Sequence, residues 1–259
     1  MITRALAGVL LAGAIALAAR KTRSLSTTGA FAALVVGTAA TIAGWGFAIV
    51  VITFFIVSSA LSRIRRAARE ARIAGIVEKG DERDALQVLA NGGVFAVAAI
   101  TYALTSNPAF AIAALGALAG AAADTWATEI GTLAGGVPRS IVSLSELPPG
   151  TSGGVTLVGT AASVVGAFLV ALVSYLTGVA FSPVAVFVGG IAGSIGDSLI
   201  GATVQERRWC DTCDKATERR VHICGSATRV VGGVSGLRND FVNVLCTVIG
   251  AVVAVAVAR

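Results

Sequence analysis

The sequence is poor in charged residues and contains a single histidine. Only 13% of its 259 residues are charged, whereas soluble globular domains average about 25%. Hydrophobic residues make up 56% of the chain. This composition excludes an ordinary soluble domain and predicts an integral membrane protein.

Eight apolar stretches are long enough, or nearly so, to cross a bilayer core, which takes about 20 helical residues. They are residues 3–19, 28–44, 45–61, 87–104, 108–132, 153–178, 182–204 and 238–258. Only Gly44-Trp45-Gly46 separates the second from the third. We interpret it as a tight hairpin, because one helix of about 33 residues would overshoot the membrane. We therefore predict an all-α, polytopic transmembrane bundle of eight helices, with seven as the alternative, in a single domain over residues 1–259.

Positive charge lies almost entirely on one side of the predicted bundle. All basic residues except Arg4 and Arg259 fall in the loops after the first, third, fifth and seventh helices. Short loops rich in Lys and Arg stay in the cytoplasm. We therefore expect a multi-pass protein of the cell membrane with both termini outside. Two cytoplasmic segments are long, a basic interfacial loop at residues 62–86 and a Cys- and His-containing loop at residues 205–230.

Two segments next to basic residues have alternative interpretations. Residues 1–19 have the pattern of a signal peptide, but the basic residues directly after them favour a membrane anchor, since a signal peptide would require their export. The 62–86 loop has an arginine at every third position, which makes a basic stripe on an interfacial helix. This stripe either anchors the loop to anionic lipid or attracts an anionic substrate. Its members are Arg63, Arg66, Arg69 and Arg72.

Two predicted hairpins share one sequence pattern. Each begins with a polar residue before Gly-Gly-Val, turns at Asn107-Pro108 or Ser182-Pro183, and returns through Ala-Gly-x-x-x-Asp and a hydroxyl residue. The order predicts a parallel repeat of two helical hairpins, and sites often lie at a repeat interface. Chance similarity between Gly- and Ala-rich helices is the alternative.

The returning segments carry small residues at every fourth position, which indicates close helix packing. On the same faces lie Asp124 and Asp197. A charge within hydrocarbon costs at least about 2.5 kcal/mol. These two aspartates therefore need cations or hydrogen-bond donors as partners.

The polar residues within or at the ends of the predicted helices gather on the cytoplasmic side. Carboxylates with amides and no nearby histidine suit a hard cation, and Mg²⁺ is the usual partner of phosphate groups. This predicts phosphoryl chemistry. On a helix, Glu129 points about 140° away from Asp124 and need not meet it. The set is Asn91, Asp124, Thr128, Glu129, Thr151, Ser152, Ser194, Asp197, Ser198, Gln205, Asn239, Asp240 and Asn243.

The loop before the sixth apolar stretch offers two candidate phosphate contacts. Its glycine-rich part enters a helix, so free backbone N–H groups there suit a phosphate. It lacks the lysine of a Walker loop, and an ordinary turn explains it equally well. Arg139 is either a phosphate clamp or a charge that sets the topology. The glycine-rich residues are Gly150, Thr151, Ser152, Gly153 and Gly154.

Four zinc-type ligands lie in the 205–230 loop, at Cys210, Cys213, His222 and Cys224. In a reducing cytoplasmic loop they favour a metal site over disulfides, although the close His-x-Cys spacing departs from common zinc fingers. We predict a small knuckle with structural Zn²⁺, because all four positions are filled. Cys246 is predicted to be a small core residue of the last helix.

Several motifs occur in a characteristic order, at residues 123–131, 138–139, 150–155, 193–202 and 239–243. Together they resemble domain-of-unknown-function family 92 (DUF92), from about residue 25 to the end. This family of multispanning proteins includes animal transmembrane protein 19 and the chloroplast phytyl-phosphate kinase.

The resemblance to the plant enzyme implies Mg²⁺-dependent transfer of the terminal phosphate of CTP or ATP to a prenyl monophosphate. It implies that Asp124, Asp197 and Asp240 hold Mg²⁺ or orient the acceptor, with Glu129 in support. Phosphate binding is implied for Arg139 and the 150–154 loop, and the remaining polar residues are expected to bind substrate. These are Asn91, Ser194, Ser198, Gln205, Asn239 and Asn243.

Two other functions use the same parts. A cytidylyltransferase would make a nucleotide-activated lipid and release pyrophosphate. An ion-coupled transporter would place its charges nearer the membrane midplane. The expected partners are the lipid bilayer and these substrates, with no nucleic acid.

Overall fold

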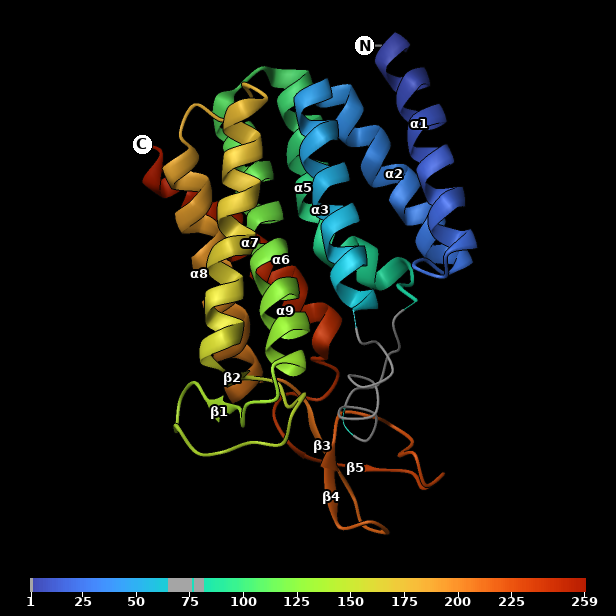
Figure 1. Ribbon diagram of the computed structural model, residues 1–259, viewed down its shortest axis with the longest axis vertical. Coiled ribbons are helices and arrows are strands. Elements are labelled where there is room, and N and C mark those ends of the chain that lie inside the picture. The colour runs from blue at the N-terminus through green and yellow to red at the C-terminus, as the bar shows by residue number, and fades with distance from the viewer. Residues whose placement is uncertain (1, 65–75, 77–81) are drawn as a thin grey trace.

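The computed structural model describes residues 2–64, 76 and 82–259, which form a helical bundle with small β-sheets at one end (Figure 1). Seven of the described helices are long and apolar enough to cross a membrane, and α2 is shorter. The predicted all-α transmembrane bundle is thereby confirmed. The helices are α1 (Ile2–Lys21), α2 (Thr27–Ala43), α3 (Trp45–Arg63), α5 (Ala85–Thr105), α6 (Pro108–Leu133), α7 (Leu157–Leu176), α8 (Pro183–Thr203) and α9 (Asn239–Val257).

The predicted break between the second and third apolar stretches falls at Gly44. This residue alone separates α2 from α3. Its φ of +154° lies in a region that side chains with a Cβ rarely adopt. Its amide donates to the carbonyl of Ala40 at 3.0 Å and closes α2. The two stretches are therefore separate helices, as predicted.

Two small sheets lie at the end of the bundle where α6 and α8 end and α7 and α9 begin (Figure 1). β1 (Arg139–Ser140) pairs antiparallel with β2 (Gly154–Val155). β3 (Arg207–Cys210), β4 (Lys215–Thr217) and β5 (Arg229–Gly232) form an antiparallel sheet in the order β4-β3-β5. We call this the loop end of the bundle.

The structure corrects one helix boundary and leaves one prediction outside its scope. The helix expected to start at residue 153 begins at Leu157, because Gly154 and Val155 are taken up by pairing with β1. Most of the predicted basic stripe, at Arg66, Arg69 and Arg72, lies outside the described residues.

The returning helices of the predicted repeat, α6 and α8, pack against the same residues of α9. A Cβ built on Gly116 or on Gly189 would lie 2.5 Å from the carbonyl oxygen of Gly250. One turn further along, the equivalent glycines of α6 and α8 approach each other and the buried Cys246. The next turn of the two helices carries Asp124 and Asp197.

We expect Gly116→Ala to lower the stability by about 1–3 kcal/mol. The added methyl group would overlap Gly250 and lie 2.4 Å from the Cβ of Ala254. Gly93→Ala in α5 is the matched control, because the added methyl group would lie 4.0 Å from the Cβ of Leu89, at ordinary van der Waals distance. Thermal unfolding of the detergent-solubilised variants, followed by circular dichroism, compares the two. Equal melting temperatures would contradict the close packing of α6 on α9.

Candidate functional site

A polar cavity of about 620 Å³ lies at the loop end of the bundle. We call it the polar cavity. Carboxylate, hydroxyl and amide side chains from α5 to α9 make up much of its wall. The predicted site residues that line it are Asn91, Asp124, Thr128, Glu129, Gly150, Thr151, Ser152, Gly153, Gly154, Ser194, Asp197, Ser198, Gln205, Asn239, Asp240 and Asn243. Residues that are far apart in sequence therefore share one cavity.

Asp124 of α6 and Asp197 of α8 form an acidic pair. Their carboxyl groups lie within hydrogen-bonding reach of each other. Oδ1 of Asp197 is buried and has no hydrogen-bond partner among the described residues. Two carboxylates at this distance repel each other unless a cation or a proton lies between them. The pair and the unsatisfied oxygen therefore fit ligation of a hard divalent cation.

The other two predicted carboxylates line the polar cavity at separate places. Asp240 lies in the first turn of α9. Oε1 of Glu129 accepts a hydrogen bond from the hydroxyl of Ser62 in α3 at 2.7 Å, so a protein group already occupies that oxygen. No three carboxylates of the described residues lie close enough together to hold one ion. A Mg²⁺ ion at the pair would take its remaining ligands from water or phosphate, as Mg²⁺ commonly does.

The glycine-rich loop already binds an anion, the carboxylate of Glu218. The backbone amide of Ser152 donates to Oε1 of Glu218 at 3.3 Å, and the Ser152 hydroxyl donates to the same oxygen. The amides of Thr151 and Gly154 donate to carbonyls of the same loop. The sequence predicts free backbone N–H groups in this loop, but these three are already hydrogen-bonded. A phosphate at Ser152 would have to displace Glu218.

Arg139 is not among the residues that line the polar cavity. It lies on β1, where its exposed guanidinium forms an ion pair with Glu146 at 2.9 Å. In the described part of the chain, the basic residues of the cavity wall are Arg83 and Arg238. Both flank the start of a helix, which places them beside the polar residues of α5 and α9.

Sequence reasoning did not single out several polar residues of the cavity wall, among them Ser62, Gln87, Glu206 and Glu218. Gln87 has a local signal, because it completes a capping box with Asp84 at the start of α5. Glu206 and Glu218 belong to the 205–230 loop. They contact loop residues that are far apart from them in the sequence, Gly236 and Ser152, so no sequence pattern predicts these contacts.

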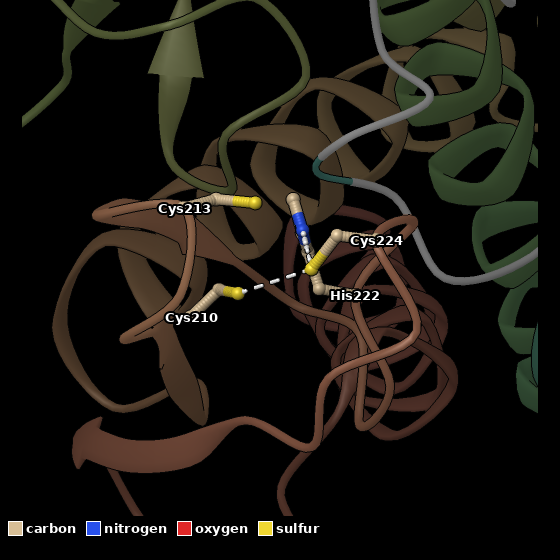
Figure 2. Close-up of side chains that lie close together, drawn as sticks. All are labelled: Cys210, Cys213, His222 and Cys224. Atoms are coloured by element: carbon tan, nitrogen blue, oxygen red, sulfur yellow. Dashed lines mark hydrogen bonds between the residues drawn. The ribbon is translucent and has the colours of Figure 1, made fainter.

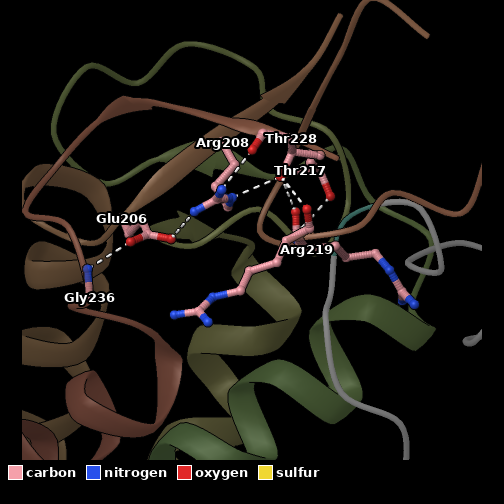
Figure 3. A network of polar contacts seen from close by, with 7 residues as sticks. Glu206, Arg208, Thr217, Arg219, Thr228 and Gly236 are labelled. Carbon is pink, nitrogen blue, oxygen red and sulfur yellow. Dashed lines mark hydrogen bonds and ion pairs between the residues drawn. The ribbon is translucent and has the colours of Figure 1, made fainter. Parts of the chain in front are cut away.

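Glu206 lines the polar cavity and is bonded to Arg208 of the three-stranded sheet, in the network drawn in Figure 3. It accepts hydrogen bonds from the Gly236 amide at 2.6 Å and from Arg208 at 2.7 Å. Arg208 also donates to Thr228, whose hydroxyl donates to the carbonyl of Arg219. The Gly236 amide, assisted by the Arg208 guanidinium, lowers the pKa of Glu206. An ionised Glu206 therefore ties the sheet to the segment that leads into α9.

The four predicted metal ligands meet at the three-stranded sheet, and we call them the Cys/His cluster (Figure 2). Their ligand atoms all lie within 4.8 Å of one another. The Sγ atoms of Cys210 and Cys224 are 3.6 Å apart, and Nδ1 of His222 lies 3.2 Å from Sγ of Cys224. Sulfurs on a tetrahedral zinc ion are about 3.8 Å apart, because a Zn–S bond is about 2.3 Å long. A disulfide would join them at about 2.0 Å, so the spacing fits metal ligation.

Comparison with known proteins identifies the same family as the sequence motifs. The chain matches the family described as integral membrane protein DUF92 over residues 10–251. It is 29% identical to an uncharacterized membrane protein of Methanocaldococcus jannaschii, over 98% of this chain and 94% of the relative. It is 28% identical to Protein PGR of Arabidopsis thaliana, over 93% and 91% of the two chains. Protein VTE6, chloroplastic, from the same plant is 26% identical, over 89% of this chain and 64% of the relative.

No solved structure matches the chain. The family match covers almost all of the helices and both sheets. This protein therefore belongs to the DUF92 family of integral membrane proteins.

Proposed function

We propose that this protein transfers a phosphoryl group from a nucleoside triphosphate to the phosphate of a membrane lipid, with phytyl-like prenyl monophosphates as acceptors. One observation carries the proposal. The polar cavity adjoins an apolar cavity, and Arg83, Gln87 and Asn91 line both. An amphiphile with an anionic head and an apolar tail fits this pair of cavities.

The apolar cavity, of about 90 Å³, lies among α1, α2, α3 and α5. Its wall consists mainly of aliphatic and aromatic side chains, among them Val36, Val51 and Phe55. Such a wall makes no hydrogen-bonding demand on its occupant, which suits an isoprenoid chain. The shared residues lie where the head of that lipid would enter the polar cavity.

Phosphoryl transfer is catalysed mainly by positioning and by neutralisation of charge. Asp124 and Asp197 would hold Mg²⁺, which when bound neutralises charge on the phosphates. Arg83 and Arg238 on the same wall supply positive charge for the acceptor or donor phosphates. The acceptor oxygen is already anionic, so the site requires no strong general base.

The position of the acidic pair favours an enzyme over an ion-coupled carrier. Asp124 and Asp197 both lie on the loop side of the midpoints of their helices, whereas a carrier places its ion sites near the midplane. We further propose that this face is cytoplasmic, because the loops on it carry nearly all the basic residues.

Asp197→Asn is expected to reduce phosphoryl transfer at least about 100-fold, because it removes one of the two carboxylates proposed to hold Mg²⁺. The assay follows label from a γ-labelled nucleoside triphosphate into prenyl monophosphates in micelles containing Mg²⁺. Asp211→Asn is the control, since Asp211 is exposed and pairs with Arg229 outside the cavity. Both variants should melt close to the parent protein.

The same assay separates the other functions. A cytidylyltransferase would release the γ-label as pyrophosphate and form an unlabelled lipid product that carries the nucleotide. Absence of any transfer by the parent protein, together with solute uptake into vesicles, would replace the proposed kinase with a carrier.

Val51→Trp is expected to raise KM roughly tenfold for long prenyl monophosphates, because the larger side chain displaces about two methylene groups from the apolar cavity. The KM for a short-chain prenyl monophosphate should not change. Val97→Trp is the matched control, because Val97 is exposed on α5 and is not part of the cavity wall. An equal loss for short and long acceptors would show that the tail does not occupy this cavity.

A further inference from the structure

The Cys/His cluster and the polar cavity are joined by one short stretch of chain. Glu218 directly follows β4 and lies between Cys213 and His222 in the sequence. Its carboxylate accepts hydrogen bonds from the amide and the hydroxyl of Ser152, and it lines the polar cavity. Two members of the cluster therefore flank the residue that contacts the glycine-rich loop.

We propose that the Cys/His cluster is a structural zinc site whose role is to hold Glu218 on Ser152, and so to fix the glycine-rich loop as one wall of the polar cavity. Three thiols and an imidazole are the ligand types that zinc takes in structural sites. Four such ligands complete a tetrahedron and leave no position open for a substrate or a reactive water.

The surrounding unit has a specific need for such a metal. Within the described residues 205–236, the buried side chains are polar groups or members of the cluster: Gln205, Glu206, Cys210, Thr217, His222 and Thr228. Most of the larger apolar side chains of the unit, including Val221, Ile223, Val230 and Val231, are exposed, and Trp209 is only partly buried. A unit this small with so little apolar core usually depends on a metal or a disulfide for its fold, and the cysteines here are free.

Metal binding would fix the stretch from Cys213 to His222 at both ends. The free energy of metal binding then offsets the entropy lost when this stretch becomes ordered. Without the metal, the hydrogen bonds between Glu218 and Ser152 would have to offset much of that loss themselves. The hydrogen bonds from Thr228 to the carbonyls of Arg219 and Arg220 hold the next residues in place. The metal site and the loop are therefore predicted to be coupled.

The first test measures metal in the purified full-length protein by inductively coupled plasma mass spectrometry. We expect one zinc ion per chain, and its loss in Cys213→Ser. Cys246→Ala is the matched control, because Cys246 lies in α9 outside the cluster and its removal should leave the zinc content unchanged. A parent protein that neither carries zinc nor takes it up overturns the proposal.

The second test follows hydrogen exchange in peptides that contain Ser152. Removal of zinc with a chelator should speed exchange of the Ser152 amide at least about tenfold, because a hydrogen bond to a charged group is lost, and added zinc should restore it. Glu218→Ala should keep its zinc and still show the fast exchange. Unchanged exchange after zinc removal would show that the metal does not hold the loop. Neither measurement depends on activity, so a failure of the proposed reaction would not be mistaken for a failure of this inference.

Discussion

The close approach of α6, α8 and α9 is the constraint on which the rest of the structure depends. Glycines on α6 and α8 let both helices contact the backbone of α9, and Gly120 and Gly193 let them contact each other. Because the contact runs along equivalent faces, the following turn brings Asp124 and Asp197 together. The acidic pair is thus a consequence of helix packing. A larger side chain at Gly120 or Gly193 would push α6 and α8 apart and so separate the two carboxylates.

This packing resolves a conflict between the apolar helices and the charges they carry. A carboxylate surrounded by hydrocarbon is costly, but the pair faces a polar cavity that also contains hydroxyl, amide and guanidinium groups. The loops complete that cavity, and the three-stranded sheet contributes Glu206 and Glu218 to its wall. The membrane-spanning helices supply the acidic pair, and the loops outside them determine the shape of its surroundings.

Much of this arrangement could be predicted from the sequence, because the bilayer leaves few alternatives. A spanning segment must satisfy its own backbone hydrogen bonds, so each long apolar run had to be a helix. Gly44 could be recognised as a break because the run was too long for one helix. Polar residues in such helices are rare enough that Asp124 and Asp197 stood out as site residues.

The loops were harder to predict, for a physical reason. The ion pair of Arg139 with Glu146 and the pairing of β1 with β2 depend on which loop segments meet in space. The contact of Glu218 with Ser152 joins residues 66 positions apart. No periodic pattern marks such contacts, since neither a helix face nor a strand face specifies them. For this reason the sequence did not predict that the Ser152 amide is already bonded to Glu218.

The two cavities meet at Arg83, Gln87 and Asn91, and this affects which concentration of a lipid ligand determines its binding. Under the proposed function, the lipid acceptor would reach the site from the bilayer, while the nucleotide would reach it from water. The occupancy of the lipid would then follow its mole fraction in the membrane. Dilution with inert lipid or detergent would then weaken apparent binding, even at a constant amount of ligand per volume.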